Sequence, residues 1–167
     1  LRGSYVALVT PFKKDATLDH KKLEELVEFH IANGTDGLVP CGTTGESPTL
    51  SHDEHDEAIE IVIKATNKRI PVLAGAGSNS TEEALRLIKH AEKVGADGVL
   101  VVTPYYNRPS QAGLIRHYTI LSESTGLPIV PYNVPGRTSV NILPDTMAKL
   151  AELKNIIGVK EASGNLA

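Results

Sequence analysis

Short apolar runs alternate with longer amphipathic stretches along the whole chain. The runs begin near Tyr5, Gly37, Ile70, Gly98, Pro128 and Ile156. Their intervals of 28 to 33 residues are typical of strand–helix units joined in parallel. Since the runs are short and rich in Val, Ile and Leu, they fit parallel strands that are covered on both faces. The pattern therefore predicts an α/β protein with six strands.

Helix signals lie between these runs. An apolar row with helical spacing runs through residues 19–33, and Gly34 follows it as a stop. Ser with Glu three residues later is the signature of a capping box, which opens a helix. Ser51 with Glu54 and Ser80 with Glu83 predict the starts of two helices. A further helix is predicted over residues 110–125, and the last predicted helix begins at Pro144.

Two architectures fit this alternation: an open doubly wound sheet, with one ligand site, and a (β/α)8 TIM barrel, whose site draws on many strand ends. Nearly every predicted strand is followed by residues suited to a functional site, namely glycine, threonine, tyrosine or lysine, which favours the barrel. A complete barrel has about 250 residues. With 167 residues, starting at Leu, the chain is expected to be one incomplete domain (1–167), truncated after the sixth strand. The remaining barrel units and C-terminal helices would be absent, and we expect little activity from the 167 residues alone.

The charge, the apolar runs and the cysteine content exclude several classes of function. The formal charge is −3, so no basic surface for nucleic acid or anionic membranes is expected. No apolar run approaches the roughly 18 residues of a membrane span. The single cysteine, Cys41, forbids an intrachain disulfide and favours a cytoplasmic location.

Lys160 ends the sixth apolar run, which has no other charge. Strict alternation would put it on the same face as Gly158 and Ile156. Apolar surroundings lower the pKa of a lysine, and the neutral amine can then attack a carbonyl to form a Schiff base. The alternative is a lysine that extends from a strand end into solvent.

Tyr132 occupies the fifth position of its run, as Lys160 does in the next run. Neighbouring strands lie about 4.8 Å apart, so the phenol and the amine are expected to meet at the strand ends. A phenol can donate and accept the proton that imine formation moves. The alternative is a tyrosine bonded to a backbone carbonyl.

Other segments suggest anion binding. The turn Gly42–Glu46 could aim backbone N–H groups and the hydroxyls of Thr43 and Thr44 at a carboxylate or a phosphate. Arg137 could hold a second carboxylate, although a surface arginine is the ordinary interpretation. The turn Gly75–Gly77 resembles a dinucleotide motif only superficially, because its third glycine position holds Ser80.

His52 and His55 stand three residues apart at the start of a predicted helix. Read as metal ligands they lack a convincing third partner, and such pairs usually lie on solvated helix faces. We expect no metal and no organic cofactor.

Four segments together resemble the 4-hydroxy-tetrahydrodipicolinate (dihydrodipicolinate) synthase family of pyruvate-dependent class I aldolases. They are Gly42–Glu46, Thr103–Pro109, Tyr132–Thr138 and Gly158–Ala162. The resemblance implies a lyase of lysine and diaminopimelate biosynthesis that condenses pyruvate with aspartate semialdehyde. The first segment and the lysine alone also fit N-acetylneuraminate lyase and keto-deoxy-sugar-acid aldolases.

The resemblance also implies the roles of individual residues. Lys160 would form the Schiff base with pyruvate, and Tyr132 would relay protons through Thr44 to Tyr106, supplied by a neighbouring subunit. Thr43 and Thr44 would hold the carboxylate of pyruvate. Arg137 would hold the carboxylate of aspartate semialdehyde, and sugar-acid aldolases generally lack an arginine there.

Some family members are homotetramers, built as dimers of dimers, and bind L-lysine as an inhibitor between two subunits. The positions matching that effector site are Ser47, Pro48, His52, His55, Asn79, Glu83 and Tyr105. Glu83 would bind the amino group and Tyr105 the carboxylate of the effector. The alternatives are another pyruvate-dependent aldolase, an inactive truncated barrel and a noncatalytic α/β module that retains these motifs.

Overall fold

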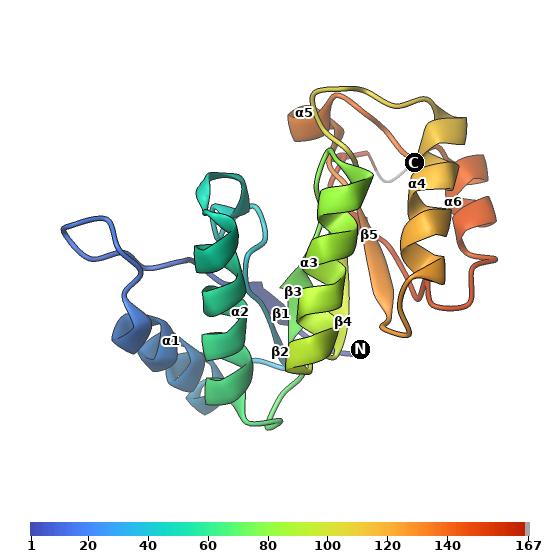
Figure 1. Ribbon diagram of the computed structural model, residues 1–167. Helices are drawn as coiled ribbons and strands as arrows, with labels where there is room; N and C mark the ends of the chain where they lie inside the picture. The colour runs from blue at the N-terminus through green and yellow to red at the C-terminus, as the bar shows by residue number, and fades with distance from the viewer. Residues whose placement is uncertain (166–167) are drawn as a thin grey trace. The chain divides into compact units, whose positions relative to one another are not determined.

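The computed structural model describes residues 1–165, in which strands and helices alternate as the sequence predicts (Figure 1). In chain order the elements are β1 (Tyr5–Ala7), α1 (His20–Ala32), β2 (Gly37–Val39), η1 (Ser47–Thr49), α2 (His52–Thr66), β3 (Leu73–Gly75), α3 (Thr81–Val94), β4 (Gly98–Val102), α4 (Gln111–Glu123), β5 (Ile129–Asn133), α5 (Pro135–Thr138), α6 (Pro144–Leu150) and β6 (Lys160–Glu161). The 3-10 helix η1 and the short helix α5 were not predicted. Among these helices none is both long and apolar enough to cross a membrane.

The chain divides into two compact units. The first unit contains Leu1–Gly75 and His90–Asp97, and the second contains Ala76–Lys89 and Gly98–Ala167. The boundary passes through α3, so this helix contributes residues to both. The expectation of a single domain over residues 1–167 therefore stays a prediction.

The first unit contains a parallel sheet and two helices that pack on each other. β1 pairs with β2 in parallel, with Tyr5 opposite Gly37, and Leu38 bridges Val72 beside β3. α1 and α2 lie side by side (Figure 1). The side chains that are fully buried in this unit include Val27, Leu38, Ile59 and Val62.

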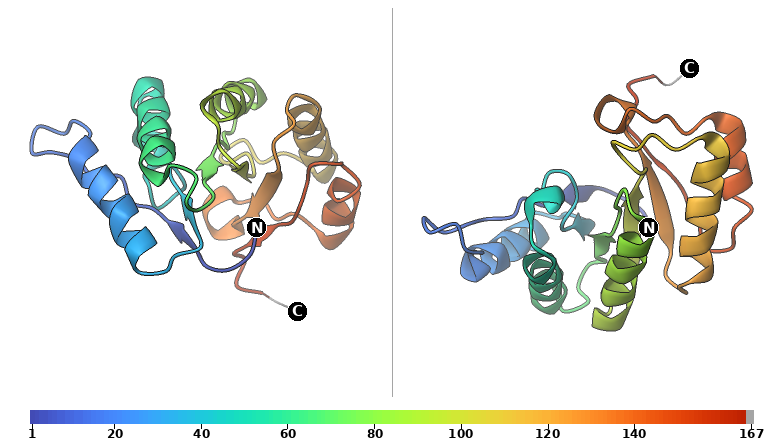
Figure 2. Two further views of the ribbon diagram at one scale, coloured as in Figure 1. Left: turned by 90° about the horizontal axis from the view of Figure 1, so that it is seen from below. Right: turned by 45° about the horizontal axis from the view of Figure 1, so that its top comes forward.

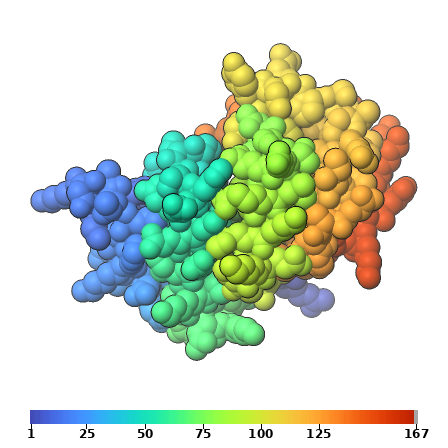
Figure 3. All heavy atoms as spheres, in the orientation of Figure 1, coloured from blue at the N-terminus to red at the C-terminus, as the bar shows by residue number. Residues whose placement is uncertain are grey.

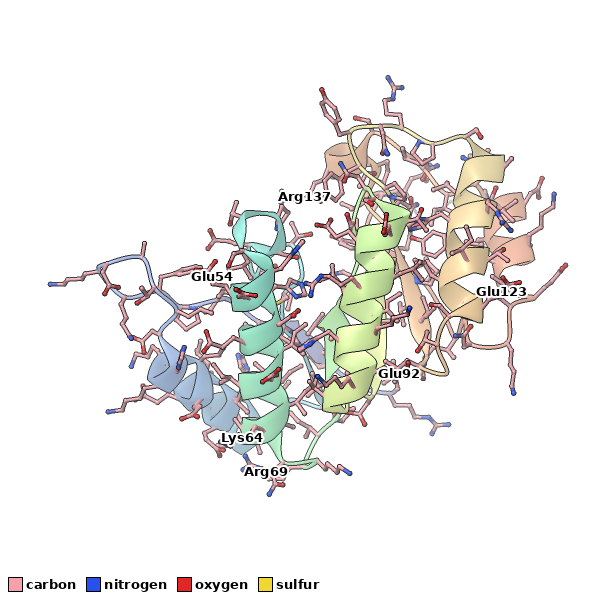
Figure 4. All side chains as sticks on the ribbon, in the orientation of Figure 1. Glu54, Lys64, Arg69, Glu92, Glu123 and Arg137 are labelled. Atoms are coloured by element: carbon pink, nitrogen blue, oxygen red, sulfur yellow. The ribbon has the colours of Figure 1, made fainter. Side chains whose placement is uncertain are left out.

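Both ends of α2 are fixed by hydrogen bonds. At its start, the Ser51 hydroxyl accepts from the Glu54 N–H at 3.2 Å and the Ser51 N–H donates to the Glu54 carboxylate at 2.8 Å, which confirms the predicted capping box. At its end, Asn67 takes a left-handed conformation with φ of 46°. The Arg69 side chain donates to the last carbonyls of the helix, at 2.7 Å to Ala65. Figure 4 labels Glu54 and Arg69 at the opposite ends of α2.

The second unit is built on the parallel strands β4, β5 and β6. β4 pairs with β5 from Val99 opposite Ile129 to Val102 opposite Tyr132. α4 and α6 lie side by side (Figures 2 and 3). Tyr118 of α4 is fully buried and donates its hydroxyl to the Val101 carbonyl at 2.9 Å, which ties this helix to β4.

The sixth apolar run does not form one regular strand. Ile156 bridges Ile129, but Lys160 pairs with Tyr132, so this run advances four residues while β5 advances three. One extra residue is therefore inserted between Ile156 and Lys160, as in a β-bulge. Ile129 and Tyr132 are three residues apart and face opposite sides of β5. The prediction that Lys160 shares a face with Ile156 is therefore wrong, and Lys160 begins β6 instead of ending a longer strand.

Candidate functional site

Lys160 and Tyr132 lie side by side in the second unit, as their equal positions in neighbouring runs predict. They are paired residues of β6 and β5, and the Lys160 Nζ lies 4.2 Å from the centroid of the Tyr132 ring. The Tyr132 side chain belongs to the core with 7% of the residue exposed, whereas Lys160 is exposed. An amine and a phenol therefore meet near the carboxyl end of two parallel strands.

The surroundings act on the Lys160 ammonium in two directions. Partial burial lowers the pKa of Lys160 below its ordinary value, because desolvation disfavours the charged form. The face of the Tyr132 ring opposes this effect, since its negative quadrupole attracts a cation. Only the neutral amine attacks a carbonyl. The burial therefore increases the reactive fraction of this amine at a given pH.

Arg137 lies on α5, immediately after β5, and its side chain is exposed (Figure 4). α5 starts with Pro135, where the missing N–H has no helical partner anyway, and it ends at Ser139 with φ of 57°. This single turn sets a guanidinium a few residues beyond Tyr132. An exposed guanidinium of this kind can bind a carboxylate through two parallel hydrogen bonds.

The segment after β4 presents Tyr106 to solvent. This residue is 88% exposed, and its φ of 71° is a left-handed backbone conformation that residues other than glycine rarely adopt. The neighbouring Asn107 side chain donates to the Asn79 carbonyl at 2.9 Å and fixes the segment from one side. The exposed phenol is in a position that a partner could contact.

Thr43 and Thr44 lie in a tight turn of the first unit. The turn is closed by the Gly45 N–H, which donates to the Gly42 carbonyl at 3.0 Å, and by the Thr10 hydroxyl, which donates to the Gly45 carbonyl at 2.6 Å. Both threonine side chains are exposed, and within residues 1–75 and 90–97 their backbone N–H groups have no hydrogen-bond acceptor. Two successive free N–H groups form a concavity that can bind an anion.

Gly75, the last residue of β3, and Gly77, which follows the strand, are needed for close packing. A Cβ at Gly75 would overlap the carbonyl oxygen of Cys41, and a Cβ at Gly77 would overlap the backbone nitrogen of Val102. Both contacts are with backbone, which cannot move aside as the end of a side chain can. These contacts explain the Gly-Ala-Gly sequence without a nucleotide.

The residues expected to bind an effector are divided between the two units. Ser47, Pro48, His52 and His55 belong to the first unit, and Asn79, Glu83 and Tyr105 belong to the second. Their assembly into one site therefore stays a prediction. Glu83 also has a local structural role, because its carboxylate accepts from the Ser78 hydroxyl and its N–H donates to the Ser80 hydroxyl at 3.3 Å.

His55 does not lie on a solvated helix face, contrary to the ordinary interpretation of the sequence. Only 3% of it is exposed, and its Nδ1 lies 3.9 Å from the Asp56 carboxylate. The reason is the helical period, because His55 falls three and four residues before the buried Ala58 and Ile59. Among residues 1–165, no group of three or more His, Cys, Asp and Glu residues is placed to hold a metal ion.

Strands and helices alternate, and Lys160 and Tyr132 are paired on two neighbouring parallel strands, which defines the class: an α/β protein with candidate reactive groups near the carboxyl ends of parallel strands. The chain belongs to the Dihydrodipicolinate synthetase family, which it matches over residues 1–167. The predicted family and the predicted fold class are thereby confirmed.

Individual relatives agree with this assignment. The chain is 64% identical over 165 residues to the 4-hydroxy-tetrahydrodipicolinate synthase of Syntrophus aciditrophicus, covering 99% of the chain and 56% of the relative. It is 53% identical to the chloride-inhibited dihydrodipicolinate synthase of Acinetobacter baumannii in complex with pyruvate, with a TM-score of 0.97 over 98% of this chain and 56% of that one. It is 45% identical to the enzyme of Cyanidioschyzon merolae with lysine bound, with a TM-score of 0.95 over 98% of this chain and 56% of that one.

The chain thus spans little more than half the length of the relatives it matches. Membership of the family and the α/β fold with parallel strands hold for the residues present. The activity, substrates and partners of such relatives belong to longer chains.

Proposed function

We propose that this chain is part of a lyase that condenses pyruvate with L-aspartate 4-semialdehyde to give 4-hydroxy-tetrahydrodipicolinate, in lysine and diaminopimelate biosynthesis. Membership of a family whose relatives are named synthases supports a lyase of this type. The observation that carries the proposal is the Lys160 amine, 4.2 Å from the centre of the Tyr132 ring.

In the proposed reaction the neutral Lys160 amine attacks the ketone carbon of pyruvate. The carbonyl π electrons move to oxygen, which takes a proton, and the resulting carbinolamine loses water to form the imine. Tyr132 supplies the proton to the departing oxygen and accepts one from nitrogen. The relay from Tyr132 through Thr44 to a Tyr106 of a neighbouring subunit is part of the proposal. Loss of a methyl proton then gives the enamine that attacks the aldehyde.

Two anion-binding features would hold the substrates. The N–H groups and hydroxyls of Thr43 and Thr44 would bind the carboxylate of pyruvate, and their lack of other backbone acceptors in the first unit supports this. Arg137 would bind the carboxylate of the semialdehyde. No metal or organic cofactor is part of this chemistry, in which the lysine itself forms the covalent intermediate.

Reduction with sodium borohydride in the presence of pyruvate tests the proposal. Borohydride reduces an imine to a stable secondary amine, so the proteolytic peptide containing Lys160 should gain the mass of a reduced pyruvyl group. Trapping needs one imine per protein molecule and no turnover, so it also tests a chain with low activity. An unmodified Lys160 would instead favour a noncatalytic module that retains the motifs.

The acceptor aldehyde separates the proposed lyase from a related aldolase. With pyruvate present, we expect aspartate semialdehyde to be consumed. The aldehydes that sugar-acid aldolases use should not be consumed. The exposed Arg137 supports this preference, because the family resemblance implies that sugar-acid aldolases generally lack an arginine there. Assembly as a homotetramer and a cytoplasmic location remain predictions.

An L-lysine effector site is a second proposal. The enzyme of Cyanidioschyzon merolae has lysine bound, and the matching residues here offer a carboxylate, a phenol and polar groups that suit an amino acid. Titration calorimetry of the full-length enzyme should detect heat for L-lysine and none for L-norleucine, which lacks the side-chain ammonium. Equal heats, or no heat with lysine, would exclude the site.

A further inference from the structure

Lys160 is held in place by a very short strand. β6 contains only Lys160 and Glu161, and among the described residues of the second unit it pairs with β5 alone. The residues just before it, Gly158 and Val159, are exposed. Few ladder hydrogen bonds therefore determine which residue of this segment lies beside Tyr132.

The inserted residue makes the register of this segment ambiguous. Slippage by one position would place Val159 or Glu161 beside Tyr132 in place of Lys160. Backbone hydrogen bonds are the same for any residue, so the ladder alone does not select Lys160. A side-chain interaction is needed to specify the register.

The side chain of Asn133 makes such an interaction. Asn133 is 1% exposed, and its amide nitrogen donates to the Glu161 carboxylate and to the Asn141 side-chain oxygen, both at 2.8 Å. Its amide oxygen accepts from the Ile142 N–H at 2.9 Å. The hydrogen bond from Asn133, with those from Ser163, lowers the pKa of the Glu161 carboxyl, which therefore stays ionised.

The Asn133–Glu161 hydrogen bond lies one position beyond the reactive pair, on the same two strands. Asn133 pairs with Glu161 just as Tyr132 pairs with Lys160, and consecutive residues of a strand face opposite sides. The hydrogen bonds to Asn141 and Ile142 also join the two ends of the loop that carries Arg137. One buried amide thus connects both segments that bear candidate reactive groups.

We propose that Asn133 is a positioning residue, whose amide fixes β6 to β5 in the register that puts Lys160 beside Tyr132 and closes the loop of Arg137. Its importance for catalysis rests on the proposed function. The positioning itself concerns only the residues of this chain.

The test measures the reactivity of the Lys160 amine without pyruvate. Acetic anhydride acetylates neutral amines, so the labelling of Lys160 as a function of pH, quantified by mass spectrometry, reports the pKa of Lys160. The first variant is Glu161→Ala, at an exposed residue whose loss leaves the core intact. Loss of the nearby negative charge alone would move the labelling curve to lower pH. If Lys160 instead leaves its place beside Tyr132, the labelling curve would move to higher pH, because an ammonium released into solvent regains its ordinary pKa.

We expect the Glu161→Ala curve to move upward by at least half a pKa unit, so that labelling at neutral pH falls about threefold. Asn133→Asp, which sets two carboxylates against each other, should also move it upward. The double variant Asn133→Asp with Glu161→Gln keeps the net charge and restores the hydrogen bond with donor and acceptor exchanged. Its curve should return to that of the unchanged protein.

Asn155→Asp is the matched control, because it makes the same chemical change as Asn133→Asp at another residue of the second unit. Asn155 lies five residues before Lys160, and its side chain donates to three backbone carbonyls. It should lower the melting temperature and leave the Lys160 curve in place. An unchanged or downward-shifted curve for Glu161→Ala, or no return in the double variant, overturns the proposal. If pyruvate is not trapped on the unchanged protein while the labelling curves shift as expected, the proposed function fails and the positioning role stands.

Discussion

Replacing Lys160 with arginine is expected to reduce the borohydride-stable pyruvate adduct to background, a loss of at least about a thousandfold. Arginine keeps the positive charge and the approximate length of the side chain, but its guanidinium stays protonated and forms no imine under these conditions. The stacking of a cation on the Tyr132 ring would be retained. The measurement is the mass of the peptide around position 160 after treatment with pyruvate and borohydride.

Lys154→Arg provides the matched control for this experiment. Lys154 is an exposed lysine of the same unit, six residues before Lys160. The same chemical change there should leave the amount of adduct unaltered. If the adduct persists in the Lys160→Arg protein, a different amine forms the imine, and the assignment of Lys160 is wrong.

The sequence predicted those features of the fold that depend on local pattern. The spacing of apolar runs predicted the regions of β1 to β5, whereas the sixth run meets β6 only at its last residue, Lys160. Ser51 with Glu54 marked the start of α2, where the capping box is present. Equal positions in adjacent runs placed Tyr132 beside Lys160. These features were predictable because strand period, helix capping and the parallel order of strands are encoded within a few residues.

Features that depend on pairing between segments could not be predicted in the same way. The bulge near Gly158 is visible only when the bridge at Ile156 is compared with the pair at Lys160, so alternation within one strand gave the wrong face. The amide of Asn133 contacts residues 8 and 28 positions away, and no local pattern indicates such partners. His55 is different, because its position in the apolar row of α2 is itself a local signal of burial.

In the proposed reaction, the exposed Lys160 and the core residue Tyr132 would have different roles. An amine must be reached by a ketone from solution, and it gains reactivity from partial burial. A proton donor and acceptor must instead be held in one orientation, which the packing of Tyr132 in the core provides. The two side chains would therefore contribute differently to the proposed reaction, and removal of the phenol hydroxyl should affect the rate more than the binding of pyruvate.

Tyr132→Phe is accordingly expected to slow the formation of the trapped adduct by about a hundredfold or more, since a positioned proton donor typically contributes that much. Phenylalanine keeps the ring that packs in the core and faces the Lys160 ammonium, and only the hydroxyl is lost. The concentration of pyruvate at half-maximal rate should therefore change little. The rate of adduct formation, measured by quenching with borohydride over a range of pyruvate concentrations, separates the two quantities.

Tyr118→Phe removes the same hydroxyl from another residue of the second unit, a fully buried phenol that donates to the Val101 carbonyl and also contacts the backbone of Tyr132. It should lower the free energy of unfolding by about 1 kcal/mol, the usual net value of one hydrogen bond, and leave the trapping rate unchanged. Equal slowing in both variants would mean that destabilisation and not proton transfer limits the reaction. A Tyr132→Phe protein that is trapped at the original rate would assign the proton transfer to solvent, because no other property of the site is altered by this substitution.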